Sequence, residues 1–582
     1  MLQEQNYWSR RLGRPLSRRS VLARAAAGGA TLAGAGLSAC GRSIGGGRSG
    51  ATSGVQPQAP AGTPQPGGTL KVFLPYNPPL DPQKVSAAAQ QAVGGSYSRL
   101  FRFRTGPDPK VITDHDLEND LAASIESPDA ITWTVKLRPD ARFHNIAPVN
   151  GHAVEAEDIK ATFTRALDAA TSDPNRGSLG MVDAAQIQTP DKQTVVFKLV
   201  YPYAPFRKTL ASPTYSMIFP REVLTGGYDP SKTIIGSGPF VADSLTPDVA
   251  NVSKKNPDWF EKGVPYLDSA RVAVIPDRSA QLAQFAGGNL DELILDNIED
   301  VNTVQQRQPK AQVFKARRAS PFPLYFQMGD PSSPFQDIRL RRAVSMAIDR
   351  ETLGKAIFNG QWESVVYVPA YTGKWSMQVS DLPQDTKQYY TYNPAEAKRL
   401  VQAAGAGGLQ LKLAYLVNGP GSFSPSPSYK SHAETVANML KAVGLKTVLI
   451  THDYNKDFVD AGKGSRQGYF DKDVLMFASA GSNSDADEWL FSYFHSKSTS
   501  NQEHLNDTTY DAMVDKQRTL VNEDERLKAV VEIQKYLADK VYAPSTVGTY
   551  GWAVVSPRVQ SYQYSNSLGK NTETYAKIWL KG

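Results

Sequence analysis

The order of expected elements over residues 410–451 constrains the fold of this chain more than any other feature. Residues 410–417 and 446–451 have the apolar spacing of strands, and residues 433–443 between them have that of a helix. The spacing of apolar side chains separates the two kinds of element, because strands repeat every two residues and helices every 3.6. Strands that alternate with helices are typical of α/β domains, so we expect an α/β fold.

Earlier segments show the same two spacings. A first strand is expected at residues 67–72. Residues 131–137 alternate apolar and polar side chains, with residues 194–199 as the expected partner strand. One helix face is expected between these two strands, formed by Ile159, Phe163, Ala166 and Leu167.

Three later helices have recognisable ends. A single helix is expected from an N-cap at Asp337 through Arg350. Residues 393–405 have an N-cap asparagine, a proline at the first helical position and a final glycine, and residues 525–541 have a continuous apolar face. The run Gly-Ser-Gly-Pro-Phe at 236–240 predicts a turn that depends on its glycines.

The positive charge of the chain is confined to its N-terminal segment. The 582 residues carry a formal net charge of +7, and residues 1–68 contain eight arginines and one acidic residue. The remainder therefore has equal numbers of basic and acidic residues. A nucleic-acid partner is not expected, because phosphate contacts need a basic surplus.

Residues 17–40 have the features of an export signal. Arg18 and Arg19 precede an apolar run rich in small residues, which ends in Leu-Ser-Ala-Cys at Cys40. The arginine pair resembles a twin-arginine signal, although general export is the alternative. The end resembles a lipobox, in which Cys40, the only cysteine, would receive a diacylglyceryl group. Residues 41–67 are rich in Gly, Ser, Pro and Gln and predict a flexible tether.

Five segments resemble motifs of one family, in the order in which that family has them. The motifs are Leu-Ala-Ala-Ser to Phe-His at 121–144, Asn-Gly to Ala-Glu-Asp-Ile at 150–159, Gly-Ser-Gly-Pro-Phe at 236–240, Pro-Phe-Gln-Asp-Ile-Arg to Ala-Ile-Asp-Arg at 334–350, and Asn-Pro-Ala-Glu to Ala-Gly at 393–405. The chain thereby resembles the oligopeptide- and dipeptide-binding family (family 5) of solute-binding proteins of ABC importers.

This resemblance implies a type II, two-lobed periplasmic-binding-protein clamshell of α/β class, with an extra domain inserted near the N-terminus. The expected segments are a signal at 1–40, a tether at 41–67, a first lobe at 68–98, 212–319 and 545–582, an inserted domain at 99–211, and a second lobe at 320–544.

No catalytic or metal motif is recognisable, so neither catalytic residues nor a metal or cofactor is predicted. The seven histidines have no metal-ligand spacing, and no Gly-x-Ser-x-Gly or Walker A motif occurs. The acidic cluster Asp485-Ala-Asp-Glu is interpreted as a helix start, with Ser484 or Asp485 as the N-cap of a helix that contains Trp489; calcium binding or acid–base chemistry is the alternative.

The loop after residue 477 is the expected ligand site. In the family, this loop often carries an aspartate that pairs with the ammonium group of a peptide; here Ser482 occupies that position, which leaves a sugar or a metal chelate as alternative solutes. Aromatic side chains suit a wide cleft, although each one here could instead pack in a core. The ligand-binding candidates are Tyr325, Phe326, Phe477, Ser482, Asn483, Asp485, Trp489, Tyr550 and Trp552.

The expected function is that of a monomeric receptor, lipid-anchored at the outer face of the cytoplasmic membrane. It would capture a small solute, most simply a peptide, and deliver it to an ABC permease. Two alternatives stay open: an exported enzyme with a site around Asp485 and Asp487, and a sensor or chaperone lipoprotein that takes no part in transport.

Overall fold

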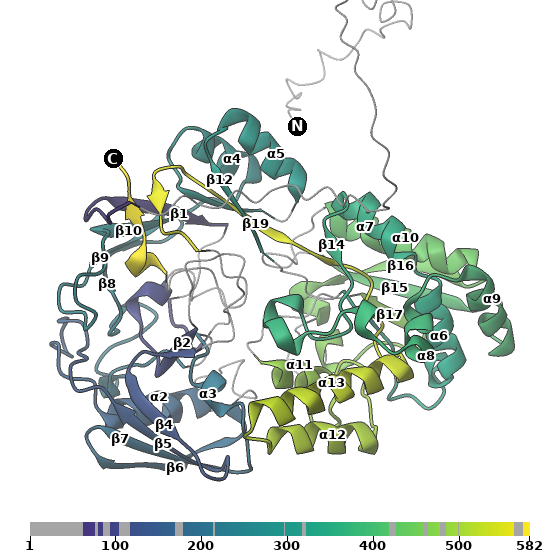
Figure 1. Ribbon diagram of the computed structural model, residues 1–582, viewed down its shortest axis with the longest axis horizontal. Coiled ribbons are helices and arrows are strands. Elements are labelled where there is room, and N and C mark those ends of the chain that lie inside the picture. Colours follow the sequence, from purple (N-terminus) through teal and green to yellow (C-terminus); the bar gives the residue numbers. More distant parts are fainter. Residues whose placement is uncertain are drawn as a thin grey trace, which may run out of the picture. The chain divides into compact units, whose positions relative to one another are not determined.

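The computed structural model in Figure 1 describes thirteen stretches of the chain. These are residues 62–75, 80–84, 93–103, 117–168, 179–213, 216–295, 297–316, 322–417, 427–458, 464–477, 485–498, 500–563 and 574–582. The predicted signal and Cys40 lie outside these residues. Every element below belongs to one compact unit, residues 55–582.

The first sheet joins the start of the described chain to strands far along the sequence. Its order is β1 (Thr69–Leu74), β10 (Ser269–Val274), β9 (Ala250–Lys255), β8 (Phe240–Thr246), and β1 pairs with β10 in parallel. The expected first strand is therefore confirmed. The predicted turn before β8 depends on its glycines because the backbone of this turn lies very close to that of Ser96. A Cβ on Gly236 would lie 2.0 Å from the carbonyl oxygen of Ser96.

A second sheet is antiparallel, in the order β4 (Ala122–Glu126), β5 (Thr132–Leu137), β7 (Thr194–Leu199), β6 (Val182–Asp191). The predicted pairing of residues 131–137 with 194–199 is confirmed, with Thr132 opposite Lys198. Helix α2 (Ala156–Leu167) buries the predicted Ile159, Phe163 and Ala166 and begins in a capping box. Two strands, β2 (Phe101–Phe103) and β3 (Leu117–Asn119), and the short helix α3 (Phe206–Thr209) complete this region.

The third sheet carries the predicted strand–helix–strand unit. Its order is β13 (Leu324–Tyr325), β17 (Val474–Phe477), β15 (Gln410–Val417), β16 (Lys446–Asp453), and α10 (Pro427–Ala442) connects β15 to β16. Strands β15, β16 and β17 are parallel, and only β13 runs against them. The predicted α/β alternation is confirmed.

The prediction of a single helix from Asp337 to Arg350 is wrong. Asp337 does cap a helix, α6 (Ile338–Met346), but Asp349 caps a second one, α7 (Arg350–Phe358), by accepting a hydrogen bond from the backbone N–H of Thr352. A side chain that accepts from a backbone N–H three residues later favours a new helix start over continuation of the first helix.

The other predicted helices are confirmed, with small shifts at their ends. Helix α9 (Pro394–Ala403) is capped by Asn393 and followed by Gly405 at φ +68°. Helix α13 (Glu523–Lys540) replaces the expected 525–541 and follows α11 (Ala486–Phe494) and α12 (Thr508–Arg518).

The remaining elements are small. They are α4 (Arg278–Ala286), β11 (Glu292–Leu295), α5 (Ile298–Arg307), β12 (Gln312–Ala316), β14 (Trp362–Glu363), α8 (Gln384–Lys387), β18 (Gly548–Thr549), β19 (Gly551–Val555), β20 (Val559–Gln560) and β21 (Trp579–Leu580). The C-terminal strand β19 lies between β11 and β12 and is antiparallel to both.

Buried apolar side chains separate into four main clusters. The largest draws on residues 322–547, the second mainly on residues 100–211, and two smaller ones lie under the first sheet and around β19. The second cluster also includes Trp259 and Phe260, so the antiparallel sheet region packs against the first sheet region.

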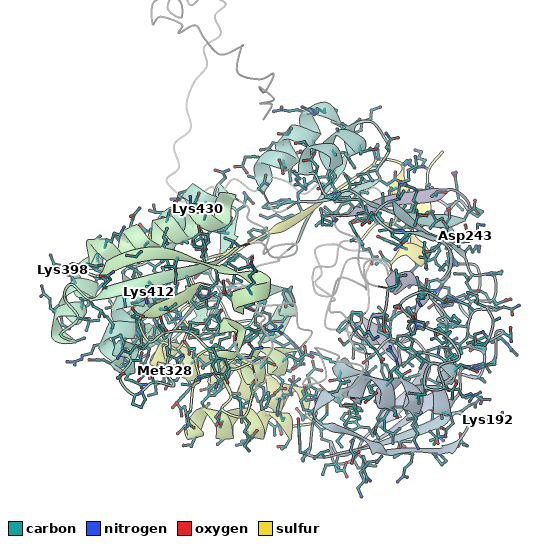
Figure 2. All side chains as sticks on the ribbon, turned by 180° about the vertical axis from the view of Figure 1, so that it is seen from behind. Lys192, Asp243, Met328, Lys398, Lys412 and Lys430 are labelled. Carbon is teal, nitrogen blue, oxygen red and sulfur yellow. The ribbon has the colours of Figure 1, made fainter. Side chains whose placement is uncertain are left out.

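Exposed lysines are spread over several elements. Figure 2 shows Lys192 in the β6–β7 turn, Lys398 on α9 and Lys430 on α10 at separate places on the surface. Within the described stretches, no helix combines the length and the apolar character that crossing a membrane would require.

Candidate ligand-binding site

The expected ligand loop joins two well-defined elements. It leaves the carboxyl end of β17 and enters α11 at Asp485, which caps the helix by accepting from the backbone N–H of Asp487 at 2.8 Å. The edge beyond the carboxyl ends of parallel strands is where open α/β sheets bind ligands. Ser482 and Asn483 lie outside the described residues, as does the side chain of Phe477.

The carboxylate of Asp485 is buried and paired with two cations. Arg526 donates to both of its oxygens, and the Nζ of Lys208 lies 3.1 Å from Oδ2. Burial alone would raise the pKa of Asp485, but Arg526 and Lys208 hold it well below the ordinary value. The predicted cap is confirmed. A ligand ammonium could reach this carboxylate only by displacing one of its cations, so ligand binding by Asp485 stays a prediction.

Asp487, in the first turn of α11, is also paired with an arginine. Arg518 donates from Nε at 2.8 Å and from Nη2 at 2.9 Å, and the hydroxyl of Tyr203 donates at 3.0 Å. Gln517 also donates to this carboxylate and accepts from Nε of Arg526 at 3.0 Å. The two aspartates thereby share one hydrogen-bonded set.

We call this set the buried ion network. Its members are Tyr203, Lys208, Asp485, Asp487, Gln517, Arg518 and Arg526. It joins α3 and the residues just before it to the ends of α11, α12 and α13, and a backbone hydrogen bond of 2.7 Å from Ala204 to Arg518 adds to the contact. The network therefore links segment 99–211 to segment 320–544.

Lys208 is the least satisfied member of the network. Its Nζ is buried, has no hydrogen-bond partner among the described residues, and lies in an ion pair with Asp485. Burial lowers the pKa of this ammonium group. The indole ring of Trp375 is close to both cations that face Asp485, with its centroid 4.7 Å from Nζ of Lys208 and 4.7 Å from Cζ of Arg526.

Three of the aromatic candidates pack in apolar cores, and Trp489 and Tyr550 have other features. Tyr325 and Phe326 are buried in the 322–547 cluster and Trp552 in the cluster around β19, so core packing accounts for all three. Trp489 is buried on α11, and its indole N–H has no hydrogen-bond partner among the described residues. Tyr550 is half-buried, with Nζ of Lys315 3.7 Å from its ring centroid. A ligand-binding role for these residues stays a prediction.

A buried glutamate connects the two ends of the 322–547 region. Oε1 of Glu503 accepts from the backbone N–H of Phe326 at 2.9 Å and from that of Ala543 at 3.1 Å. Burial raises the pKa of Glu503 to about 8. Sequence reasoning missed this residue, as it missed Lys208, Arg518 and Arg526, because no local motif marks a charged side chain whose partners lie far along the chain.

Comparison with known proteins adds a family and a fold. The profile of the bacterial extracellular solute-binding proteins, family 5 (middle region), matches residues 116–501. Heme-binding protein A of Haemophilus influenzae is 25% identical over 518 residues, which are 85% of this chain and 89% of that protein.

Two solved structures cover most of the chain. DppA from Helicobacter pylori, a periplasmic binding protein in complex with the peptide STSA, has a TM-score of 0.70 at 20% identity and covers 89% of this chain and 99% of its own. AgaA from A. tumefaciens, in complex with agropinic acid, has a TM-score of 0.68 at 24% identity over 88% and 99%. The predicted type II periplasmic-binding-protein fold is thereby confirmed.

Proposed function

The chain belongs to family 5 of the bacterial extracellular solute-binding proteins, and from this premise we propose that it captures a peptide-like solute for an ABC permease by closing two lobes around it. One observation carries the closing step. The carboxylates that begin α11, directly after the expected ligand loop, are paired with cations and a tyrosine from segment 99–211 as well as from their own segment.

In this proposal, the inserted domain comprises residues 99–211 and the second lobe residues 320–544, and the buried ion network forms when they meet. The separation of the 100–211 and 322–547 clusters supports these boundaries. A solute that contacts both lobes favours the closed state only by its difference in affinity for the two states. The network lowers the free energy of the closed state. A smaller difference between the solute's affinities for the closed and the open state is then enough to close the lobes.

The proposed solute is peptide-like rather than a standard peptide held by its ammonium group. Ser482 replaces the expected aspartate, and the nearby carboxylates of Asp485 and Asp487 are already paired with arginines. A solute with an acylated or otherwise neutral amino end avoids an ammonium group without a counterion. The names of relatives and neighbours specify haem, a peptide and agropinic acid, so chemically different solutes occur among proteins similar to this chain.

The proposal also places the receptor outside the cytoplasm, anchored through a lipid on Cys40. The support is the sequence of residues 17–40. Replacement of Cys40 by alanine should abolish lipid labelling and leave the protein in the soluble or unprocessed fraction. A processed protein that stays with the membrane after this change would contradict the anchor.

A thermal-shift screen of the purified full chain tests the solute class. The probes are short peptides with free and with acetylated amino ends, opines, haem, oligosaccharides and metal chelates. A solute that binds only the folded state stabilises it by about 2.7 kcal/mol at a hundredfold excess over Kd. We expect the largest shift with acetylated peptides or opines, and recovery of the solute unchanged by mass spectrometry. A response to free-amine peptides alone would contradict the proposed class, and conversion of the solute would favour an enzyme.

A further inference from the structure

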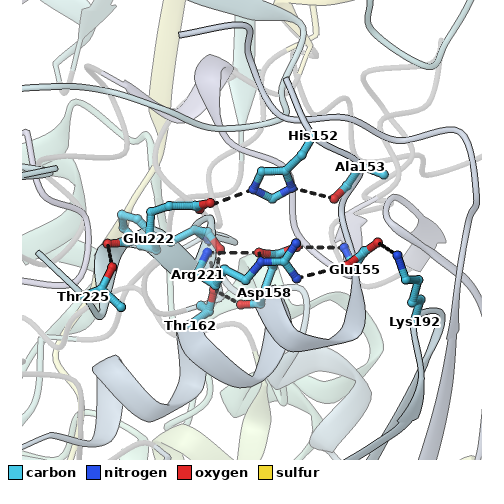
Figure 3. Close-up of polar contacts among 10 residues, drawn as sticks. His152, Ala153, Glu155, Asp158, Thr162, Lys192, Arg221, Glu222 and Thr225 are labelled. Carbon is cyan, nitrogen blue, oxygen red and sulfur yellow. Dashed lines mark hydrogen bonds and ion pairs between the residues drawn. The ribbon is translucent and has the colours of Figure 1, made fainter. Parts of the chain in front are cut away.

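A histidine and two carboxylates meet away from the candidate ligand site. His152 lies in the loop before α2, Asp158 in the first turn of α2, and Glu222 in the short helical turn Arg221–Val223. One ligand atom from each of the three side chains lies within 4.8 Å of the other two (Figure 3). Asp158 is fully buried, whereas the side chains of His152 and Glu222 are 24% and 26% exposed, so an ion has access from solvent.

The imidazole of His152 is oriented with its free nitrogen toward Glu222. Nδ1 lies 2.8 Å from the carbonyl oxygen of Ala153, and because a carbonyl only accepts, Nδ1 carries the proton. The ring also packs edge-on against Phe143, with centroids 5.1 Å apart. In the neutral ring, Nε2 then directs a lone pair at Oε2 of Glu222, 3.3 Å away. Two lone pairs at this distance require a positive species between them, either a proton or a metal ion.

The distance between these two atoms favours the metal ion. A charge-assisted hydrogen bond from an imidazolium to a carboxylate is about 2.7–2.9 Å long, shorter than the distance here. Two ligands that each lie about 2.0–2.1 Å from a tetrahedral Zn²⁺ are about 3.3 Å apart. Metal-bound histidines also usually donate their second ring N–H to a carbonyl or carboxylate, as Nδ1 of His152 does.

Asp158 supplies the third ligand and part of the charge. Its oxygens accept the backbone N–H groups of Glu155 at 2.8 Å and Arg221 at 2.9 Å, which leaves each oxygen one further lone pair. The guanidinium of Arg221 binds Glu155 at 3.0 Å and stays 3.8 Å from Asp158. Lys192 binds Glu155 as well, so the cluster holds three carboxylates and two cations and is net negative before any ion enters.

We propose that His152, Asp158 and Glu222 form a binding site for a first-row divalent cation, Zn²⁺ foremost, with water in the remaining positions. One imidazole with two carboxylates suits zinc, whereas calcium and magnesium prefer oxygen ligands alone. The ion would connect segment 99–211 to Glu222, which lies outside that segment. This site is independent of the proposed solute, and histidine spacing in the sequence could not indicate it because Glu222 is remote from His152.

Zinc titration of the full chain, purified without a histidine tag and with Cys40→Ser to remove the thiol, tests the site. We expect one Zn²⁺ per chain by calorimetry. His152→Ala and Glu222→Gln should each weaken binding by at least about 100-fold, since even the outer partners of metal ligands contribute about 10- to 100-fold. Glu157→Gln is the matched control, because Glu157 is an exposed carboxylate on the same turn of α2. Asp158 is left intact, since it closes the capping box of α2.

Three results would overturn the proposal: no binding below millimolar Zn²⁺, unchanged affinity in both variants, or binding of Ca²⁺ with no binding of Zn²⁺. Circular dichroism of each variant without metal checks its folding. Should both variants misfold, X-ray absorption at the zinc edge of the chain with native His152 decides. One imidazole nitrogen among the ligands supports the site, and a spectrum without imidazole refutes it.

Discussion

Removal of Arg526 is the sharpest test of the buried ion network. Arg526→Met keeps the length of the side chain but takes away the donors that hold both oxygens of Asp485 and the donor to Gln517. Asp485 is 1% exposed and would keep the Lys208 ion pair and the hydrogen bond from the backbone N–H of Asp487, but no arginine. Removing one partner of a buried ion pair costs about 3–5 kcal/mol, because the remaining charge stays buried without full compensation. We expect the free energy of unfolding to fall by that amount.

Urea denaturation followed by tryptophan fluorescence measures the loss. The matched control is Arg399→Met, since Arg399 pairs with Glu396 on the exposed face of α9 and such pairs contribute about 0–1 kcal/mol. Adding Asp485→Asn to Arg526→Met should restore part of the loss, because asparagine still caps α11 without a charge. The reasoning is refuted if Arg526→Met and Arg399→Met cost the same, since Asp485 would then be solvated in solution.

Three further predictions concern binding, pH and packing. Lys208→Met should weaken binding of the solute identified by the screen about 10- to 100-fold in calorimetry, because a hydrogen bond or ion pair to a charged group contributes about 1.5–3 kcal/mol. Lys198→Met, at an exposed lysine, is the control, and equal affinities of the two variants would contradict a role of Lys208 in closure. Burial raises the pKa of Glu503 from 4.5 to about 8, so the stability that its protonated form contributes is fully present below about pH 4.5 and is lost as the pH rises through about 8. Glu503→Gln should therefore flatten the fall in Tm between pH 5 and 9. Curves of Tm against pH that run parallel for the variant and the unchanged chain would refute this. Gly236→Ala should lower stability by about 1–3 kcal/mol in thermal unfolding, because its Cβ would overlap the carbonyl of Ser96, and an unchanged Tm would disprove the close approach.

The elements that the sequence predicts well are those whose signals are local. Strands β15 and β16 fall within two residues of the expected ranges, because their apolar alternation and the helix between them lie in one short stretch. The helix at 337–350 was expected to be continuous because Asp349 is equally compatible with a helix interior and with an N-cap. Only the tertiary structure shows that it caps a second helix.

The candidate site was less predictable than the fold. The N-cap at Asp485 has a local signature, but its partner Lys208 comes from α3, on the other side of two domain boundaries in the expected division. The spacing of residues along the sequence does not show that a lysine of α3 pairs with the carboxylate that caps α11. Burial of Tyr325, Phe326 and Trp552 was equally open, since aromatic residues at strand positions serve cores and clefts alike.

The position of β19 has a consequence for biosynthesis. This strand is the middle one of its sheet, and β21, near the last residue, places Leu580 against Gly68. Until the residues from β19 onward have been made, that sheet therefore lacks its central strand, and the apolar cluster under the first sheet lacks Val555, Ile578 and Leu580. Although domains generally fold from the N-terminus during translation, the apolar cluster under the first sheet of this chain stays incomplete until these C-terminal residues have been made. Chaperones therefore meet the nascent chain with part of its earliest-made core still open.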